Sequence, residues 1–182
     1  MTRIGCIGLG AMGLPTARHL ARRFGPVAAF DTAPQDAVRA DPLLRLQPSA
    51  SDVGRNADLV FVCLPGEKAS LAVTDALMAE AHSGLTVVEL STLDPQRVRE
   101  IGARYEQHGA MFCDAPVFGT DVAVQKARSA LFLSHADAGD ALASLPDARY
   151  LNADGSPSAT AVDFGNVVTD ARRFFAMPNL LA

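Results

Sequence analysis

Residues 3–24 read RIGCIGLGAMGLPTARHLARRF, and this stretch decides the fold. An apolar run precedes the spacing Gly-x-Gly-x-x-Gly, and apolar residues at helical spacing follow it, which predicts a strand, a tight turn and a helix. Gly8 lets the chain turn out of the strand, Gly10 leaves room for a pyrophosphate against the backbone, and Gly13 lets helix and strand pack closely. Amides at the helix start would then hold the phosphates.

Glycines also gather in ordinary turns, so the spacing alone fits a purely structural turn as well. Its context favours dinucleotide binding, because the glycines follow an apolar strand over residues 4–7 and open a helix that ends at Gly25 and Pro26. The residues expected to hold the dinucleotide in this turn are Gly8, Leu9, Gly10, Ala11, Met12 and Gly13.

A second apolar strand, residues 27–30, ends at Asp31. An acidic side chain at this point accepts hydrogen bonds from a ribose 2′-hydroxyl and repels a 2′-phosphate. Residues 32–35 contain no arginine to hold such a phosphate. We therefore predict NAD as the cofactor in preference to NADP. The alternative is that Asp31 only caps the following turn or helix.

Strand-like and helix-like segments alternate along the next eighty residues. This alternation indicates a parallel sheet with right-handed crossovers, an α/β fold of the doubly wound Rossmann type. Ligands of such sheets bind outside the carboxyl ends of the strands, so Leu64, Pro65 and Thr92 are expected beside the cofactor. The predicted strands are 43–46, 57–64, 86–90 and 111–113, and the predicted helices are 34–40, 67–81 and 95–108.

The composition describes an ordinary globular chain of 182 residues with a net charge of −4 and an isoelectric point near 5.5. This charge gives no reason to expect nucleic acid or an anionic membrane as partner. No apolar run approaches membrane-spanning length, and strand-like residues begin at Arg3, which leads us to expect a cytoplasmic protein. The cysteines, Cys6, Cys63 and Cys113, lack metal-ligand spacing and are expected to be small buried hydrophobes, so no metal site is predicted.

The character of the chain changes after Asp114. We expect a dinucleotide-binding domain over residues 1–157 and a C-terminal helix and tail over 158–182, without a complete second domain. The tail, residues 174–181, is apolar enough to need a partner surface, which predicts a homo-oligomer formed through the C-terminal helix. The elements expected here are strands at 129–134 and 148–151, a short helix at 138–144 and a longer helix at 159–176.

Four patches of this sequence together resemble the β-hydroxyacid dehydrogenase family, which includes 3-hydroxyisobutyrate dehydrogenase and, more distantly, the imine reductases. The resemblance implies that the glycine turn, Leu64 and Pro65 hold the dinucleotide and that Thr92 lies near the nicotinamide. It also implies that the segment from Asp114 onward lines the substrate site. The patches read IGLGAMGLP at 7–15, VCLP at 62–65, ELST at 89–92 with Pro95, and DAPVFG at 114–119.

The sequence departs from that family in three ways. Phe118, Gly119 and Thr120 replace the usual Ser-Gly-Gly, which presents donors to a substrate carboxylate. No lysine follows Lys126 to act as the family's proton donor, and Asp163 takes the matching place, as in the imine reductases. Asp163 is equally explained as a solvated acid near a helix start. The chain also stops before the family's helical domain, as a natural short form or a fragment would.

These observations predict an NAD(P)-dependent oxidoreductase that moves a hydride between nicotinamide and a small β-hydroxy acid. Two alternatives remain open at this point. One is imine reduction, in which the substrate brings its own positive charge and suits an aspartate. The other is a dinucleotide-binding module that has lost catalysis and acts as a sensor or assembly partner.

Overall fold

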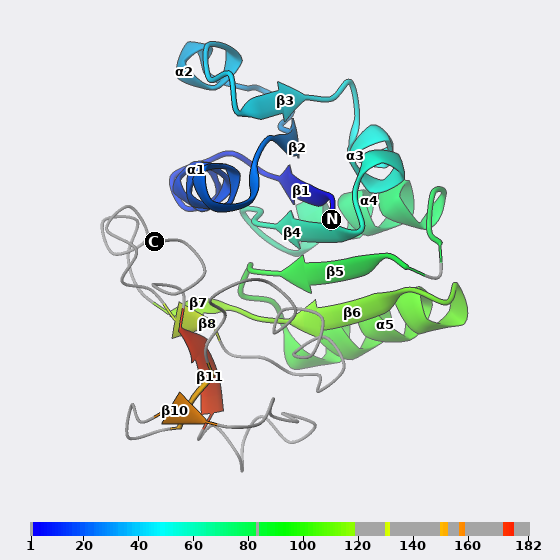
Figure 1. The fold of residues 1–182 in the computed structure, drawn as a ribbon. Coiled ribbons are helices and arrows are strands. Elements are labelled where there is room, and N and C mark those ends of the chain that lie inside the picture. The colour runs from blue at the N-terminus through cyan, green and yellow to red at the C-terminus, as the bar shows by residue number, and fades with distance from the viewer. Residues whose placement is uncertain are drawn as a thin grey trace.

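The structure is a computed structural model that describes residues 2–82 and 84–118 and, beyond them, the backbone of short strands at 130–131, 150–152, 157–158 and 173–176 (Figure 1). In residues 2–118, six strands form one sheet in the order β3-β2-β1-β4-β5-β6, and every neighbouring pair is parallel. The chain order reverses between β1 and β4, which confirms the doubly wound Rossmann arrangement. The strands are β1 (Ile4–Ile7), β2 (Val27–Phe30), β3 (Leu44–Leu46), β4 (Leu59–Val62), β5 (Thr86–Glu89) and β6 (Met111–Asp114).

Five helices connect these strands, and they include one that the sequence analysis did not predict. This is α3, for which Ser49 supplies the cap by accepting a hydrogen bond from the amide of Asp52. The pair Ser49 and Asp52 is a helix-start signature that was present in the sequence. The helices are α1 (Gly13–Phe24), α2 (Asp36–Arg39), α3 (Ala50–Asn56), α4 (Glu67–Met78) and α5 (Pro95–Gln107).

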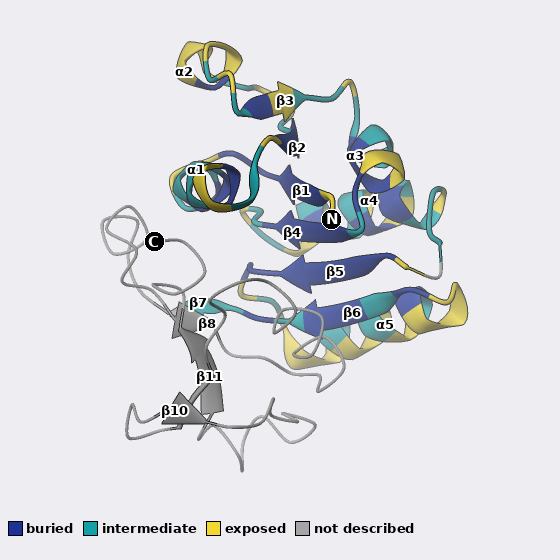
Figure 2. Cartoon of the chain, in the orientation of Figure 1, coloured by how far each residue is buried: buried dark blue, intermediate teal, exposed yellow. Residues whose placement is uncertain are grey.

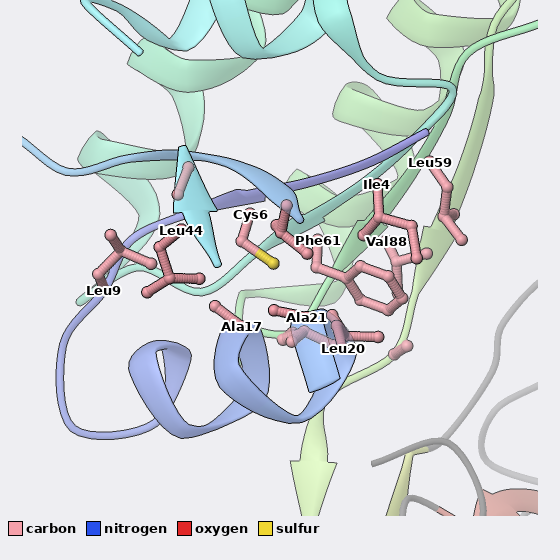
Figure 3. Packing of buried hydrophobic residues seen from close by; sticks show 14 of the residues in the cluster. Ile4, Cys6, Leu9, Ala17, Leu20, Ala21, Leu44, Leu59, Phe61 and Val88 are labelled. Carbon is pink, nitrogen blue, oxygen red and sulfur yellow. The ribbon is translucent and has the colours of Figure 1, made fainter. Parts of the chain in front are cut away.

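The sheet is buried on both faces, and the central strands are dark blue throughout in Figure 2. Successive side chains of a strand point to opposite faces, so Phe61 packs in the cluster under α1 while Val60 packs in the cluster under α3, α4 and α5. Figure 3 shows Ala17, Leu20 and Ala21 of α1 facing Phe61 and its neighbours. Complete burial of a side chain such as Leu20 contributes about 1.5–3 kcal/mol.

Strands outside the main sheet form a second, antiparallel sheet in the order β10-β9-β11-β8-β7. The strands predicted at 129–134 and 148–151 are present in shorter or shifted form as β8 and β9. The strands are β7 (Val117–Phe118), β8 (Ala130–Leu131), β9 (Tyr150–Asn152), β10 (Pro157–Ser158) and β11 (Arg173–Ala176).

The helix predicted at 159–176 is wrong at its end, because residues 173–176 form β11. This strand lies between β8 and β9 and pairs with both. Adjacent aromatic residues suit a paired strand. The hydrogen bonds to strands on both sides therefore outweigh the apolar spacing that predicted a helix. The rest of that predicted helix, and the short helix predicted at 138–144, lie outside the described residues. Within residues 2–82 and 84–118, no helix is long and apolar enough to cross a membrane.

Candidate functional site

The glycine turn joins β1 to α1, and its three glycines meet different surroundings. A Cβ on Gly8, whose φ is +87°, would lie 2.1 Å from the carbonyl oxygen of Cys63. A Cβ on Gly13 would lie 1.9 Å from the carbonyl oxygen of Gly8. A Cβ on Gly10 would meet no described atom within 4 Å. The fold therefore needs glycine at the first and third positions, while the second leaves open space against the backbone.

The start of α1 offers amides to a ligand. Met12 is the N-cap residue and its side chain makes no cap hydrogen bond, and the first turn carries no acidic residue. No side chain in the first turn of α1 therefore neutralises the positive end of the helix dipole. The exposed backbone at Gly10 lies directly before it. This arrangement favours an anion, as at other helix N-termini that follow a glycine-rich loop.

Asp31, directly after β2, reaches back to the glycine turn. Its Oδ2 atom accepts a hydrogen bond of 2.7 Å from the amide of Leu9, and its Oδ1 atom accepts one of 2.9 Å from the amide of Ala33. The second bond closes the turn after β2, as the alternative interpretation of Asp31 expected. An ionised carboxylate has about four acceptor positions, so Asp31 retains room for a hydroxyl donor.

The segments after β4 and β5 meet at the edge to which the arrowheads of β4, β5 and β6 point in Figure 1. The amide of Leu64 donates to Ser91 Oγ at 2.8 Å, and the amide of Leu90 donates to the carbonyl of Val62 at 2.7 Å. Pro65 and Thr92 are exposed there. The sheet thus presents Pro65 and Thr92 at this edge, each directly after a residue of the hydrogen-bonded pair Leu64 and Ser91.

Two carboxyl groups occupy the paired ends of β5 and β6. Glu89, only 2% exposed, is the register partner of Asp114. Burial raises the pKa of both, and the charge of Glu89 adds to the effect on Asp114, whose pKa rises to about 7. Burial, followed by the charge of Glu89, raises the pKa of the Cys63 thiol to about 11. This part of the edge therefore favours protonated groups.

A family assignment follows from comparison with known proteins. Residues 3–145 match the family described as the NAD-binding domain of 6-phosphogluconate dehydrogenase. The chain belongs to this family. The glycine turn, the helix start behind it and the strand order all lie within the matched residues, so the NAD-binding domain includes the whole site described above.

This NAD-binding domain is similar to 3-hydroxyisobutyrate dehydrogenases. The mitochondrial enzyme of Rattus norvegicus is 31% identical over 122 residues, covering 65% of this chain and 36% of the rat protein. The structure of Mycobacterium tuberculosis 3-hydroxyisobutyrate dehydrogenase with L-serine is 30% identical, has a TM-score of 0.70, and is matched over 74% of this chain and 47% of that one. An imine reductase from Pseudomonas sp. is 25% identical, with a TM-score of 0.70 and coverage of 79% and 51%.

These comparisons confirm the family resemblance seen in the four sequence patches. The chain spans about a third of the length of the rat enzyme, 36%, and about half of each solved chain, 47% and 51%. The similarity therefore concerns the NAD-binding domain. The rest of each relative has no counterpart in the matched region.

The structure of the NAD-binding domain brings part of the predicted site together. The glycine turn, Asp31 and Leu64 converge, with Thr92 on the neighbouring loop. Phe118 is placed only as backbone of β7, and Gly119, Thr120 and Asp163 lie outside the described residues. Cys6 and Cys113 are buried as expected, while Cys63 is half-buried. In the described part, no three His, Cys, Asp or Glu side chains gather as metal ligands would.

Sequence reasoning missed a basic hollow beside the glycine turn. The hollow has a volume of about 360 Å³ and extends along α1. Arg18, on its wall, also donates to Asp41 at 2.9 Å and so holds the turn between α2 and β3 near α1. The signal in the sequence was the spacing of Arg18, His19 and Arg22 on the polar face of α1. The lining residues are Gly10, Ala11, Leu14, Pro15, Arg18, His19, Arg22 and Gln35.

The raised pKa of Asp114 predicts that stability falls as pH rises. The folded chain keeps this proton up to about pH 7, whereas the unfolded chain releases it near its ordinary pKa of 3.8. Between about pH 4 and 7 the folded state binds more protons, so the free energy of unfolding declines over that window and levels off above it. We expect Asp114→Asn to remove about 1–3 kcal/mol of this decline, measured by urea unfolding at pH 5, 6 and 8.

The control for that prediction is Glu106→Gln, which neutralises an exposed carboxylate on α5. It should keep the pH dependence of the wild type. An Asp114→Asn protein whose stability declines with pH as steeply as the wild type would contradict the assignment of that proton to Asp114.

Proposed function

We propose that this chain is the dinucleotide-binding part of an NAD(P)-dependent oxidoreductase of the 3-hydroxyisobutyrate dehydrogenase type, acting between nicotinamide and a small β-hydroxy acid. The observation that carries the proposal is the open backbone at Gly10 in front of α1, a helix start without a side-chain cap. A pyrophosphate fits these two features together, because it needs close approach and hydrogen-bond donors.

The other contacts of the dinucleotide are proposed from the same edge. Asp31 accepts from the ribose at the glycine turn, and Leu64, Pro65 and Thr92 lie along the path to the nicotinamide. The bound cofactor supplies or accepts the hydride. Phe118, Gly119 and Thr120 contact the substrate, and Asp163 handles the proton in place of the family lysine. An aspartate in that role needs a pKa raised by burial in order to donate at neutral pH.

Two proposals concern organisation. Residues 1–157 form the dinucleotide-binding domain, and residues 158–182 form a C-terminal segment that includes β11, which pairs with β8 and β9. We propose that a second copy of the chain, bound through this segment, covers the nicotinamide side. Cytoplasmic location is part of the same proposal.

The deciding experiment is calorimetric titration of the full chain with NADH and with NADPH, followed by stopped-flow oxidation of the bound nucleotide with a panel of carbonyl acids and cyclic imines. Binding followed by turnover of a β-keto acid supports the dehydrogenase. Turnover of cyclic imines alone would move the chain to imine reduction, which its likeness to the Pseudomonas imine reductase favours. Binding without any turnover would support a module that has lost catalysis.

NAD is the nucleotide that we propose, because the Asp31 carboxylate faces the glycine turn. We expect Asp31→Asn to lower the preference for NADH over NADPH by about tenfold, since it removes the charge that repels a 2′-phosphate, an interaction of about 1.4 kcal/mol. The measurement is the ratio of the two dissociation constants. Asp36→Asn is the matched control, because Asp36 is an exposed carboxylate in the first turn of α2. An equal change in both variants would assign the effect to net charge and contradict the role of Asp31.

A further inference from the structure

A chain of hydrogen bonds links a buried carboxylate to the loop that follows β4. The Oε1 atom of Glu89 accepts from the amide of Ser91 at 3.0 Å. Ser91 Oγ in turn accepts from the amide of Leu64 at 2.8 Å. Glu89 therefore holds the backbone of Ser91, and the side chain of Ser91 holds the backbone of Leu64.

The pairing of the two strands does not need this chain. β4 and β5 are joined along their whole length, from Leu59 opposite Thr86 to Val62 opposite Glu89. A further backbone bond joins Leu90 to Val62. The side-chain bonds begin where this ladder ends, so they fix the loop after β4 rather than the strands.

A carboxylate is an expensive choice for this position. Glu89 ends a strand whose four residues are all buried, and an isolated buried charge costs several kcal/mol. Burial is the largest influence on this carboxyl group and raises its pKa, and its bonds to Ser91 oppose that rise only in part. The bond that the structure shows runs from the Ser91 amide to Oε1 of Glu89, at 3.0 Å. This acceptor at the end of β5 therefore has a definite partner in the next loop, which suits a residue that orients that loop.

We propose that Glu89 is a positioning residue for the dinucleotide, acting through Ser91 to hold the Leu64 amide and the exposed Pro65 beside it in the conformation that the cofactor contacts. This proposal rests on the function proposed above, because it assumes that the loop after β4 touches the dinucleotide. Neither Glu89 nor Ser91 need contact the cofactor, since both are buried beneath the loop.

The test compares NADH dissociation constants and melting temperatures for variants of the full chain. Glu89→Met keeps the volume and removes the acceptor, and Ser91→Ala removes only the hydroxyl. We expect each to weaken NADH binding about tenfold, which corresponds to the loss of about one hydrogen bond. Because the carboxylate is costly to bury, Glu89→Met should not lower the melting temperature. The double variant should bind about as weakly as the weaker single variant, since both act through one chain of contacts.

Two further variants separate positioning from structure. Glu89→Gln keeps an acceptor for the Ser91 amide and should restore most of the affinity lost in Glu89→Met. Thr86→Val changes a buried hydroxyl at the other end of the same strand and should leave NADH binding unchanged. Wild-type affinity in both Glu89→Met and Ser91→Ala would overturn the proposal. So would additive losses in the double variant.

The same titrations distinguish the failure of this inference from failure of the proposed function. A wild-type chain that binds neither NADH nor NADPH overturns both. A wild-type chain that binds, with variants that bind equally well, overturns only the role of Glu89. If Glu89→Met fails to fold, Ser91→Ala decides alone, because Ser91 lies outside the strand ladder and its substitution removes a single oxygen.

Discussion

Replacing Gly10 with alanine is expected to weaken NADH binding about 10- to 100-fold without lowering the melting temperature. The added methyl group meets no described atom within 4 Å, and such a replacement reduces the entropy of the unfolded chain by about 0.4–1 kcal/mol. The same methyl group occupies the space that a pyrophosphate needs against the backbone. Loss of one hydrogen bond to a charged group costs about 1.5–3 kcal/mol, and each 1.4 kcal/mol is about tenfold.

Calorimetric titration and a thermal melt of the same sample measure the two halves of that prediction. Gly84→Ala is the control, because Gly84 lies between α4 and β5 and its nearest described neighbour, His82, is 3.5 Å from the added carbon. The control should bind NADH like the wild type. Unchanged affinity in Gly10→Ala would remove the main support for a pyrophosphate at the glycine turn.

Gly13→Ala is expected to do the opposite and lower the stability of the fold itself. Its added carbon would lie 1.9 Å from the carbonyl oxygen and 2.9 Å from the carbonyl carbon of Gly8. These are backbone atoms, so α1 must shift away from β1. The shift disturbs the packing of Ala17 and Leu20 against the sheet. We expect a loss of about 3 kcal/mol or more in the free energy of unfolding, or about 6–12 °C in melting temperature for a chain of this size.

Urea unfolding measures this loss, and Gly102→Ala provides the comparison. Gly102 lies inside α5, where its added carbon would meet the Cδ1 atom of Phe112 at 3.3 Å. A side-chain ring can give way by a few tenths of an ångström, and alanine is favoured over glycine in a helix by about 1 kcal/mol. Gly102→Ala should therefore be neutral or stabilising. A Gly13→Ala protein as stable as the wild type would mean that helix and strand do not need their close contact.

Much of the main sheet could be predicted from the sequence, because its strands are short apolar runs and each is buried on both faces. β4 is the clearest case, with LVFV fully buried and with Pro65 and Gly66 ending the apolar run after two further residues. α3 was missed because its sequence, ASDVGRN, is short and polar and contains a glycine. Its cap at Ser49 was a local signal and would have revealed it.

β11 could not have been predicted in the same way. Phe174 and Phe175 fit a helical face as well as a strand, and their partners lie at Leu131, Tyr150 and Leu151, more than twenty residues earlier. Pairing between distant segments leaves no trace in local spacing. Apolar spacing alone cannot distinguish the two conformations over so short a run.

In the candidate site too, local features could be predicted from the sequence and contacts between distant segments could not. The backbone demands on Gly8 and Gly13 followed from sequence, since each depends on a position that the spacing defines. The bond from Leu9 to Asp31 did not, because it joins two loops that only the parallel pairing of β1 and β2 brings together. The proton on Asp114 depends on burial and on Glu89 in the next strand. Neither the Leu9–Asp31 bond nor the raised pKa of Asp114 can be predicted from the residues that flank these positions in the sequence.

The first residues of the glycine turn are held on two sides by hydrogen bonds within the protein. The amide of Gly8 donates to the carbonyl of Phe30 at 2.9 Å, and the amide of Leu9 donates to Asp31. Gly8 also packs against the backbone of Cys63. A turn held in this way is preorganised: a dinucleotide would not have to freeze it, so little conformational entropy is lost there on binding. The free energy of each phosphate contact would then appear almost undiminished in the affinity.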